Sequence, residues 1–329
     1  MTRGFARARA NIALAKYWGK CDGPLNLPAV PSVSLTLDAL VTETEVVRDP
    51  DLAADLVSLD GVLVEGPGQA RVARFVDLVR TEAGIAPGSP GSFCQITSRN
   101  HFPSASGLAS SASGFAALAG AASRAFSLDP APSTLSSLAR RGSASAARSV
   151  FGGWCELPAG LVGDNSLAAR PLHGPDHWDV AMVLALVTTG PKAVASRDGM
   201  AHTVRTSPLW PGWLASAPGY FVAVREAVGA RDLQRLGEAM EASTFAMHAS
   251  AWAAVPGVRY IKGVTLDLLD RVEALRQQGF GAWATMDAGP HVKVLCMAPE
   301  ANRVAEALRT VPGVIEARVA RPGAGIEVS

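Results

Sequence analysis

Residues 102–120, FPSASGLASSASGFAALAG, combine small side chains and hydroxyl groups without a single charged residue. A helix that starts within this segment exposes unpaired backbone N–H groups at its N-terminus, where the helix dipole adds roughly half a positive charge. Pro103 would fix the entry of the chain, and Gly107 would let the backbone approach an anion closely. The segment therefore predicts a phosphate-binding loop. The hydroxyls that can reach phosphate oxygens or a bound metal ion belong to Ser104, Ser106, Ser110 and Ser111.

Two other interpretations fit the same residues. A Gly/Ala/Ser helix can pack closely against a sheet, and Gly107, Ser111 and Gly114 also have the spacing of small residues at membrane-helix contacts. The segment is neither a Walker A sequence, since no G-K-[ST] follows, nor a G-x-G-x-x-G dinucleotide motif. The sequence thus leaves three interpretations of this segment open, namely phosphate binding, close packing against a sheet, and a membrane helix.

Four separated stretches resemble the signatures of one enzyme family. PSASGLASSAS resembles the P-x-x-x-G-L-x-S-S-x motif of the GHMP kinase superfamily. NIALAKYWGK (11–20), RRGSASAARSVFGGW (140–154) and MDAGPHV (286–292) resemble signatures of the mevalonate diphosphate decarboxylases within it. The resemblance implies ATP and Mg²⁺ as cofactors. It implies ATP binding by Pro103, Ser104, Ser106, Gly107, Leu108, Ser110 and Ser111.

The resemblance also implies a reaction. ATP phosphorylates the tertiary 3-hydroxyl of mevalonate 5-diphosphate, phosphate leaves, and loss of the carboxylate gives isopentenyl diphosphate, CO2, ADP and phosphate. Such chemistry needs a carboxylate near the hydroxyl, cations at the anionic ends of the substrate, and a held γ-phosphate.

Three residues match the catalytic group of this family. Asp287 would take or orient the hydroxyl proton and then face the developing positive charge. Lys16 would contact Asp287 and the reacting oxygen, and Arg148 would grip the substrate carboxylate with two parallel hydrogen bonds. Outside the resemblance, Asp287 is an ordinary turn residue beside Gly-Pro, and Lys16 and Arg148 are ordinary solvated cations.

The same resemblance implies contacts to the rest of the substrate. Tyr17 and Lys20 match residues that bind the diphosphate, and Ser143 and Ser145 match hydroxyls that bind the substrate or its phosphates. Arg71 aligns less securely with a further diphosphate-binding arginine, and Arg74 is the alternative one turn along the helix.

Two histidines depart from the family pattern. His291 stands where Asn commonly follows DAGP, and His101 replaces a second Asn just before the phosphate-binding motif. Either histidine could alter nucleotide contacts or hydrogen-bond a loop, and we favour the loop interpretation. His173, His177, His202 and His248 have no shared spacing of a metal site, and we expect no protein-bound metal centre.

The elements that must position these residues follow from periodicity. Residues 6–18, 32–49 and 92–103 are expected to be strands, 55–67 a hairpin that turns at Asp60-Gly61, and 69–84 a helix that stops at Gly84. We expect helices over 132–153, with Ser133 as a possible N-cap, and an apolar strand over 180–188. Long helices over 209–251 and 264–279, a hairpin over 281–298, and a final helix and strand follow.

This order predicts an α+β protein of two domains, 1–178 and 179–329. The resemblance implies the GHMP kinase fold, with an N-terminal domain like domain 2 of ribosomal protein S5, a ferredoxin-like C-terminal domain, and the site in the cleft between them. It also implies a homodimer.

The bulk composition excludes several functions. Thirty Lys and Arg against 29 Asp and Glu give a net charge of +1, too little to recruit nucleic acid or an anionic membrane. We expect no membrane span, and the four scattered cysteines favour a reducing, cytoplasmic location. Three rival functions stay open. They are a decarboxylase of mevalonate 5-phosphate, a kinase that phosphorylates the 3-hydroxyl and stops, and a non-catalytic relative that binds ATP.

Overall fold

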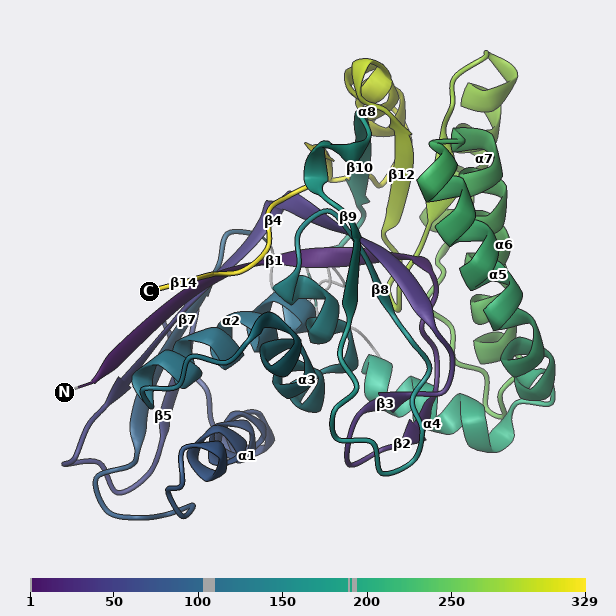
Figure 1. The fold of residues 1–329 in the computed structure, drawn as a ribbon. Coiled ribbons are helices and arrows are strands. Elements are labelled where there is room, and N and C mark those ends of the chain that lie inside the picture. Colours follow the sequence, from purple (N-terminus) through teal and green to yellow (C-terminus); the bar gives the residue numbers. More distant parts are fainter. Residues whose placement is uncertain (1, 103–109, 189, 191–193) are drawn as a thin grey trace.

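The computed structural model describes residues 2–102, 110–188, 190 and 194–329. Two sheets carry the fold (Figure 1). The first has the order β14 (Glu327–Val328), β1 (Arg3–Ala15), β4 (Ser32–Arg48), β7 (Cys94–Asn100), β5 (Leu56–Leu59) and β6 (Val62–Leu63). β8 (Trp154–Leu157) pairs with β4 and with β9 (Arg170–His173), and β2 (Lys20–Asp22) pairs with β3 (Leu27–Pro28). The second sheet has the order β11 (Trp283–Thr285), β12 (Val292–Met297), β10 (Val180–Leu186) and β13 (Glu316–Ala320).

Helices α1 (Gly66–Glu82) and α2 (Ser110–Ala125) pack against the first sheet, and α3 (Pro132–Gly142) packs against these two helices. The 3-10 helix η1 (Ala144–Val150) follows α3 directly. The second half adds α4 (Ser196–Thr206), α5 (Trp210–Ala230), α6 (Leu233–Trp252), α7 (Gly263–Gln277) and α8 (Ala301–Arg309). Two short 3-10 turns, η2 (Pro175–His177) and η3 (Ala298–Glu300), complete the elements.

Strand β1 changes character along its length. From Arg3 to Arg9 buried and partly exposed residues alternate, because one face packs on helices and the other meets solvent. From Ala10 onward every residue is buried, because the second half of the chain covers the other face there. Residues 16 to 18, which follow β1, are therefore carried into the junction between the two halves.

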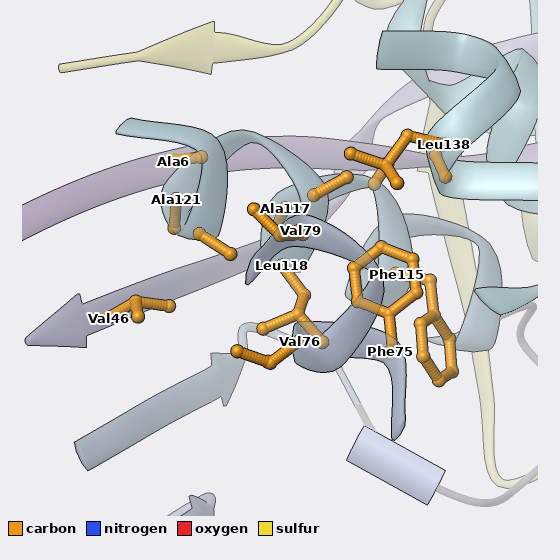
Figure 2. Close-up of a cluster of buried hydrophobic side chains, with 14 of the residues drawn as sticks. Ala6, Val46, Phe75, Val76, Val79, Phe115, Ala117, Leu118, Ala121 and Leu138 are labelled. Atoms are coloured by element: carbon orange, nitrogen blue, oxygen red, sulfur yellow. The ribbon is translucent and has the colours of Figure 1, made fainter. Parts of the chain in front are cut away.

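The core of the first half forms between α1, α2 and the sheet (Figure 2). Phe75 of α1 meets Phe115 of α2 edge to face, with ring centroids 5.4 Å apart. Small residues let α2 lie very close to β1, since a Cβ on Gly4 would stand 2.1 Å from the carbonyl oxygen of Ala121. Close packing thus accounts for the small residues within α2. Among the described helices, none is long and apolar enough to cross a membrane.

Strand β10, which was expected as an apolar strand, is buried on both faces. Met182 and Leu184 face a core shared with β1, β4, α5 and α6. Ala181 and Val183 face a second core, formed with α7, α8 and β12. The two halves of the chain are therefore joined by a continuous apolar core rather than by a linker.

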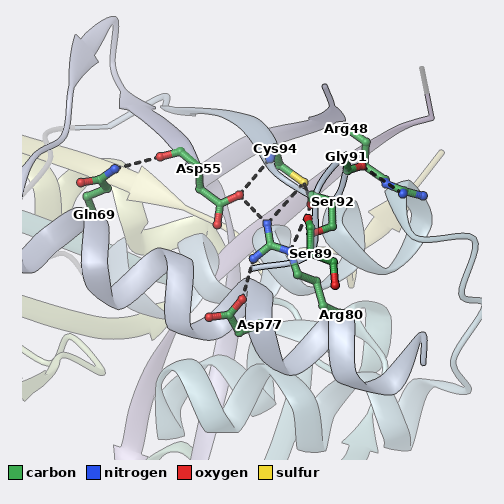
Figure 3. Close-up of polar contacts among 9 residues, drawn as sticks. All are labelled: Arg48, Asp55, Gln69, Asp77, Arg80, Ser89, Gly91, Ser92 and Cys94. Atoms are coloured by element: carbon green, nitrogen blue, oxygen red, sulfur yellow. Dashed lines mark hydrogen bonds and ion pairs between the residues drawn. The ribbon is translucent and has the colours of Figure 1, made fainter. Parts of the chain in front are cut away.

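A buried ion network ties α1 to the first sheet (Figure 3). The Arg80 side chain is 1% exposed and forms ion pairs with Asp55, which is 3% exposed, and with Asp77. Arg80 Nε donates to the carbonyl of Ser92 at 3.1 Å, and Asp55 accepts the backbone N–H of Cys94 at 2.8 Å. All of these partners of Arg80 belong to the first half of the chain.

The expected strands and helices are present, with one correction and several additions. Ser133 is not an N-cap, because α3 begins at Pro132 and its N-cap is Ala131. Pro132 at the first helical position needs no N–H partner, so the helix starts two residues earlier than an N-cap at Ser133 would place it. The short elements β2, β3, β8, β9, α4 and β14 were not expected from the sequence. The last of these pairs Val328 with Ala6 and so returns the chain to the first sheet.

Candidate active site

A cavity of about 540 Å³ lies between the two halves of the chain. All ten described residues that the sequence assigns to the site contribute to its wall, although they come from distant segments. They are Lys16, Tyr17, Lys20, Arg71, Ser110, Ser111, Ser143, Ser145, Arg148 and Asp287. The other five, Pro103, Ser104, Ser106, Gly107 and Leu108, lie outside the described residues. The individual roles of all fifteen stay predictions.

Asp287 occupies the connection between β11 and β12 and is held by two lysines. Lys16 Nζ donates to Oδ1 at 2.8 Å, and Lys293 Nζ, from β12, donates to Oδ2 at 3.0 Å. The lysine side chains are 1% and 0% exposed, whereas that of Asp287 is 21% exposed. The carboxylate therefore faces the cavity, with both ammonium groups buried around it.

This arrangement controls ionisation. Burial alone would raise the pKa of Asp287, but Lys16 and Lys293 outweigh burial and hold the pKa well below its usual range. Burial lowers the pKa of Lys16 to about 8, against the opposing attraction of Asp287. Asp287 is thus ionised at neutral pH, and Lys16 is charged below about pH 8.

Arg148 lies in η1 and is 2% exposed. Its Nε donates to Ser34 Oγ at 2.9 Å and to Asn11 Oδ1 at 3.2 Å, and its Nη1 donates to Ser32 Oγ at 2.6 Å. Asn11 is fixed in turn, because its Nδ2 donates to Ser149 Oγ at 2.8 Å. These neutral partners orient the guanidinium and leave its charge without a carboxylate among the described residues. Arg148 can therefore bind an anionic ligand at the cavity wall.

Three further cations, Lys20, Arg71 and Arg197, gather at another part of the cavity wall. Lys20 Nζ donates to Asn26 Oδ1 at 2.5 Å, and Arg71 Nη2 donates to the carbonyl of Gly142 at 2.9 Å. The residues that the structure describes provide no ion pair for any of the three. Burial, with the repulsion of Arg197, lowers the pKa of Lys20 to about 8 and that of Arg71 to about 10.

An unneutralised cluster of this kind favours a multiply charged anion. Tyr17 adds a buried hydroxyl that finds no partner within the described part of the chain. Its environment near Arg148 and Arg197 is cationic, although burial raises the pKa of the phenol. The wall thus combines charge with a spare hydrogen-bond donor.

Hydroxyl groups line the wall near the beginning of two helical segments. Ser110 and Ser111 are the first described residues of α2. Ser143 and Ser145 flank the start of η1, and their Oγ atoms are 3.1 Å apart. Hydroxyls at the N-terminal end of a helix suit phosphate oxygens, so this wall fits the expected phosphate contacts.

Comparisons with known proteins agree with this geometry. Residues 8–168 match a family model described as a diphosphomevalonate decarboxylase-like N-terminal domain, and residues 182–319 match the mevalonate 5-diphosphate decarboxylase C-terminal domain. A diphosphomevalonate decarboxylase of Candida albicans is 35% identical over 297 residues, which cover 87% of this chain and 82% of the relative. The chain belongs to the diphosphomevalonate decarboxylase family.

Solved structures of the family confirm the two-domain α+β GHMP kinase fold. One, described as a complex with MVAPP, AMPPCP and magnesium, superposes with a TM-score of 0.92 at 39% identity and covers 100% of this chain and 99% of its own. Another, from Enterococcus faecalis, concerns mevalonate diphosphate mediated ATP binding. It has a TM-score of 0.90 at 38% identity, with 100% and 99% of the two chains covered.

Sequence reasoning missed several residues of the site. Asn11 lies inside a family motif, but the sequence does not indicate its role, which is to accept a hydrogen bond from Arg148. Lys293 is a single lysine in the apolar strand VKVLCM, which is a signal that could have been followed. Arg197 lies at the start of α4, a helix that the sequence did not reveal. Asn26 reaches Lys20 from the β2–β3 hairpin, which was also not expected.

The two histidines that depart from the family pattern contact neighbouring backbone and side chains. His291 is buried, and its Nδ1 accepts the backbone N–H of Val187 at 3.2 Å. His101 Nε2 lies 2.9 Å from Glu43 Oε2, within hydrogen-bond distance. Val187 lies in the segment after β10, whereas Glu43 lies in strand β4, and the effect of either histidine on nucleotide contacts stays a prediction.

Proposed function

We propose that this protein catalyses the ATP- and Mg²⁺-dependent decarboxylation of mevalonate 5-diphosphate to isopentenyl diphosphate, CO2, ADP and phosphate. One observation carries the proposal. The cavity brings a carboxylate held by two lysines together with a guanidinium that has only neutral partners among the described residues, and with a separate cluster of cations. The named activity of the family relatives supports the same reaction.

The two anionic ends of the substrate match the two cationic parts of the wall. Arg148 binds the C1 carboxylate with two parallel hydrogen bonds. Lys20, Arg71 and Arg197 neutralise the 5-diphosphate, and Tyr17 donates to it. This binding places the 3-hydroxyl, which lies between the ends of the molecule, beside Asp287.

Asp287 then prepares the hydroxyl for phosphoryl transfer. It accepts a hydrogen bond from the 3-hydroxyl and so aims an oxygen lone pair at the γ-phosphorus of ATP. The new O–P bond forms as the bond from the γ-phosphorus to ADP breaks, and the hydroxyl proton moves to an oxygen of the transferred phosphoryl group. Lys16 supports the negative charge that collects on that group.

Decarboxylation completes the reaction. Phosphate leaves with the C3–O bonding pair, and Asp287 faces the positive charge that develops at C3. The C1–C2 bonding pair becomes the C2=C3 double bond as CO2 departs. Arg148 holds the carboxylate in line until this bond breaks.

The hydroxyl-lined wall fits the nucleotide. Ser110 and Ser111 line the cavity at the N-terminal end of α2, where hydroxyls and backbone N–H groups can contact phosphates. When bound, Mg²⁺ neutralises the phosphate oxygens, its preferred ligands. The hydroxyls of these serines would contact the phosphates or the ion.

The remaining expectations are part of the same proposal. We place the domain boundary between residues 178 and 179, and we assign the chain to the cytoplasm because its cysteines are free thiols. We also propose a homodimer, supported by the exposed aromatic side chains of Phe245 and Trp252 on α6. Light scattering on the purified protein tests the dimer.

A product assay tests the function. The protein is incubated with ATP and Mg²⁺ and, separately, with mevalonate, its 5-phosphate and its 5-diphosphate, and CO2, ADP and the organic product are quantified. We expect kcat/KM for the 5-diphosphate to exceed that for the 5-phosphate at least about tenfold, since three cations suit the longer anion. ADP without CO2 would show a 3-kinase, preference for the monophosphate would show the rival decarboxylase, and absence of ADP would show a non-catalytic relative.

A further inference from the structure

Lys293 is the member of the Asp287 cluster that the proposed function has not used. It lies in β12, where its neighbours across the sheet are Leu184 of β10 and Thr285 of β11. Its side chain is 0% exposed. A lysine in the interior of an apolar sheet is unusual, because transfer of an ammonium group from water into a protein core is costly unless a partner compensates.

The partner is Asp287. Lys293 Nζ donates to Oδ2 at 3.0 Å, while Lys16 Nζ occupies Oδ1 at 2.8 Å and also donates to the carbonyl of Ala13 at 2.8 Å. The two ammonium groups come from different halves of the chain and hold different oxygens of one carboxylate. Their combined contacts fix both the position and the plane of Asp287.

Stability alone does not account for this arrangement. A buried ion pair is often no more stable than apolar residues of the same volume, and here one carboxylate is shared by two buried cations. The charge balance makes protonation of Asp287 costly, because a neutral Asp287 would leave both ammonium groups without a counter-ion. The carboxylate therefore orients the substrate hydroxyl but does not retain its proton.

We propose that Lys293 is a positioning residue, which together with Lys16 keeps Asp287 ionised and correctly oriented towards the reacting hydroxyl. This inference rests on the proposed decarboxylation. Lys293 is buried behind Asp287, so it acts through that carboxylate and not on the substrate. Its loss should therefore change kcat and its pH dependence much more than KM.

Other charged and titratable groups also lie near Asp287. Arg148 approaches from η1, Lys16 follows β1, and His248 lies on α6. Burial and the repulsion of Lys16 lower the pKa of His248 to about 4, so this ring is neutral over most of the working range. Because Lys293 also lowers the pKa of His248, the acidic limb is compared in a His248→Gln background, where a change in the limb reports on Asp287.

The test compares Lys293→Met with Lys293→Arg. In Lys293→Met we expect kcat to fall at least about tenfold and the acidic limb of kcat to move up by at least about one pH unit, because Asp287 loses one of two adjacent cations. KM for either substrate should change less than about threefold. Lys293→Arg should recover most of kcat and return the limb to its original position. Lys262→Met, which removes an exposed lysine at the start of α7, is the matched control.

Each outcome of this test supports or overturns the proposed role of Lys293. A wild-type pH profile and kcat in Lys293→Met would overturn the role of Lys293, as would Lys293→Arg being as defective as Lys293→Met. If Lys293→Met does not fold, Lys293→Gln replaces it, since an amide keeps a donor for Asp287 but carries no charge. No CO2 from the wild type would overturn the proposed function and this inference together, whereas CO2 release with an unchanged Lys293→Met profile would overturn the inference alone.

Discussion

Two buried ion networks hold opposite balances of charge. Around Arg80, one guanidinium meets two carboxylates, Asp55 and Asp77, and its Nε donates to a backbone carbonyl (Figure 3). Around Asp287, one carboxylate meets two ammonium groups, Lys16 and Lys293. The first network is closed within the first half of the chain, whereas the second faces a cavity between the halves.

This difference in charge balance distinguishes a network that stabilises the fold from a network that can bind and orient a substrate. Arg80 satisfies groups that folding has buried, including Asp55, which also receives the backbone N–H of Cys94. The Asp287 cluster keeps an excess of positive charge, and Arg148 adds another cation whose described partners are all neutral. An excess of fixed cations around a cavity is compensated when an anionic substrate binds. Variants that remove one charge from each network can test this distinction.

The largest effect is expected for Asp287→Asn. The amide keeps the shape of the side chain but removes the negative charge, so kcat should fall about a thousandfold or more. Binding of ATP, measured by calorimetry, should persist because Asp287 acts in the chemical step. Retention of a tenth of the wild-type kcat would contradict the assigned role.

Arg80→Met should have the reverse pattern. It leaves Asp55 buried without its cation, and the free energy of unfolding should fall by about 3 kcal/mol in urea denaturation. The kcat of the folded fraction should be unchanged. Arg99→Met removes an exposed arginine from β7 in the same half and should alter the free energy of unfolding by less than about 0.5 kcal/mol. Equal losses in the two variants would remove the basis for calling the Arg80 network structural.

Arg148→Lys sharpens the comparison, because it keeps the charge and changes the geometry. An ammonium group cannot supply the parallel donors of a guanidinium, so kcat/KM should fall about thirtyfold, equivalent to about 2 kcal/mol. Arg170→Lys, at an exposed position of β9, serves as the control. An unaltered kcat/KM in Arg148→Lys would argue against the two-bond grip on the carboxylate.

The smallest effect is expected from pH. The charged forms of Lys16 and Lys20 are the active ones, and burial lowers the pKa of each to about 8. Activity should therefore be present below pH 8, and kcat/KM should decline as pH rises through this value. In Lys20→Arg, residue 20 keeps its positive charge at higher pH. The part of the decline in kcat/KM that is due to this residue should therefore shift to higher pH. A flat profile between pH 7 and 9.5 would be inconsistent with these assignments.

Local patterns and motifs predicted much of the fold and ten of the described residues that line the cavity. Alternation within residues 32–49 predicted the long strand β4, and the apolar run at 180–188 predicted strand β10. Asp287, Lys16 and Arg148 were identified from separate motifs, and the fold brings them to one cavity. These predictions succeeded because each depends on a short stretch of residues.

Features that depend on distant partners could not be predicted in this way. In the sequence alone, Lys293 is a single polar residue within an apolar strand. Its significance depends on the position of Asp287, to which it donates a hydrogen bond. Asn11 gains its significance from Arg148, which is 137 residues away along the chain. Strand β14 has only two residues, too few for a recognisable periodicity, and it is defined by its pairing with β1.

The pairing of β14 with β1 also affects the order in which the protein can be assembled on the ribosome. Val328 aligns with Ala6, so the first sheet receives a strand that is synthesised after the entire second half (Figure 1). Until then, the outer edge of β1 offers unpaired backbone groups to any extended segment nearby. The nascent chain therefore exposes this edge while residues 16–326 are synthesised.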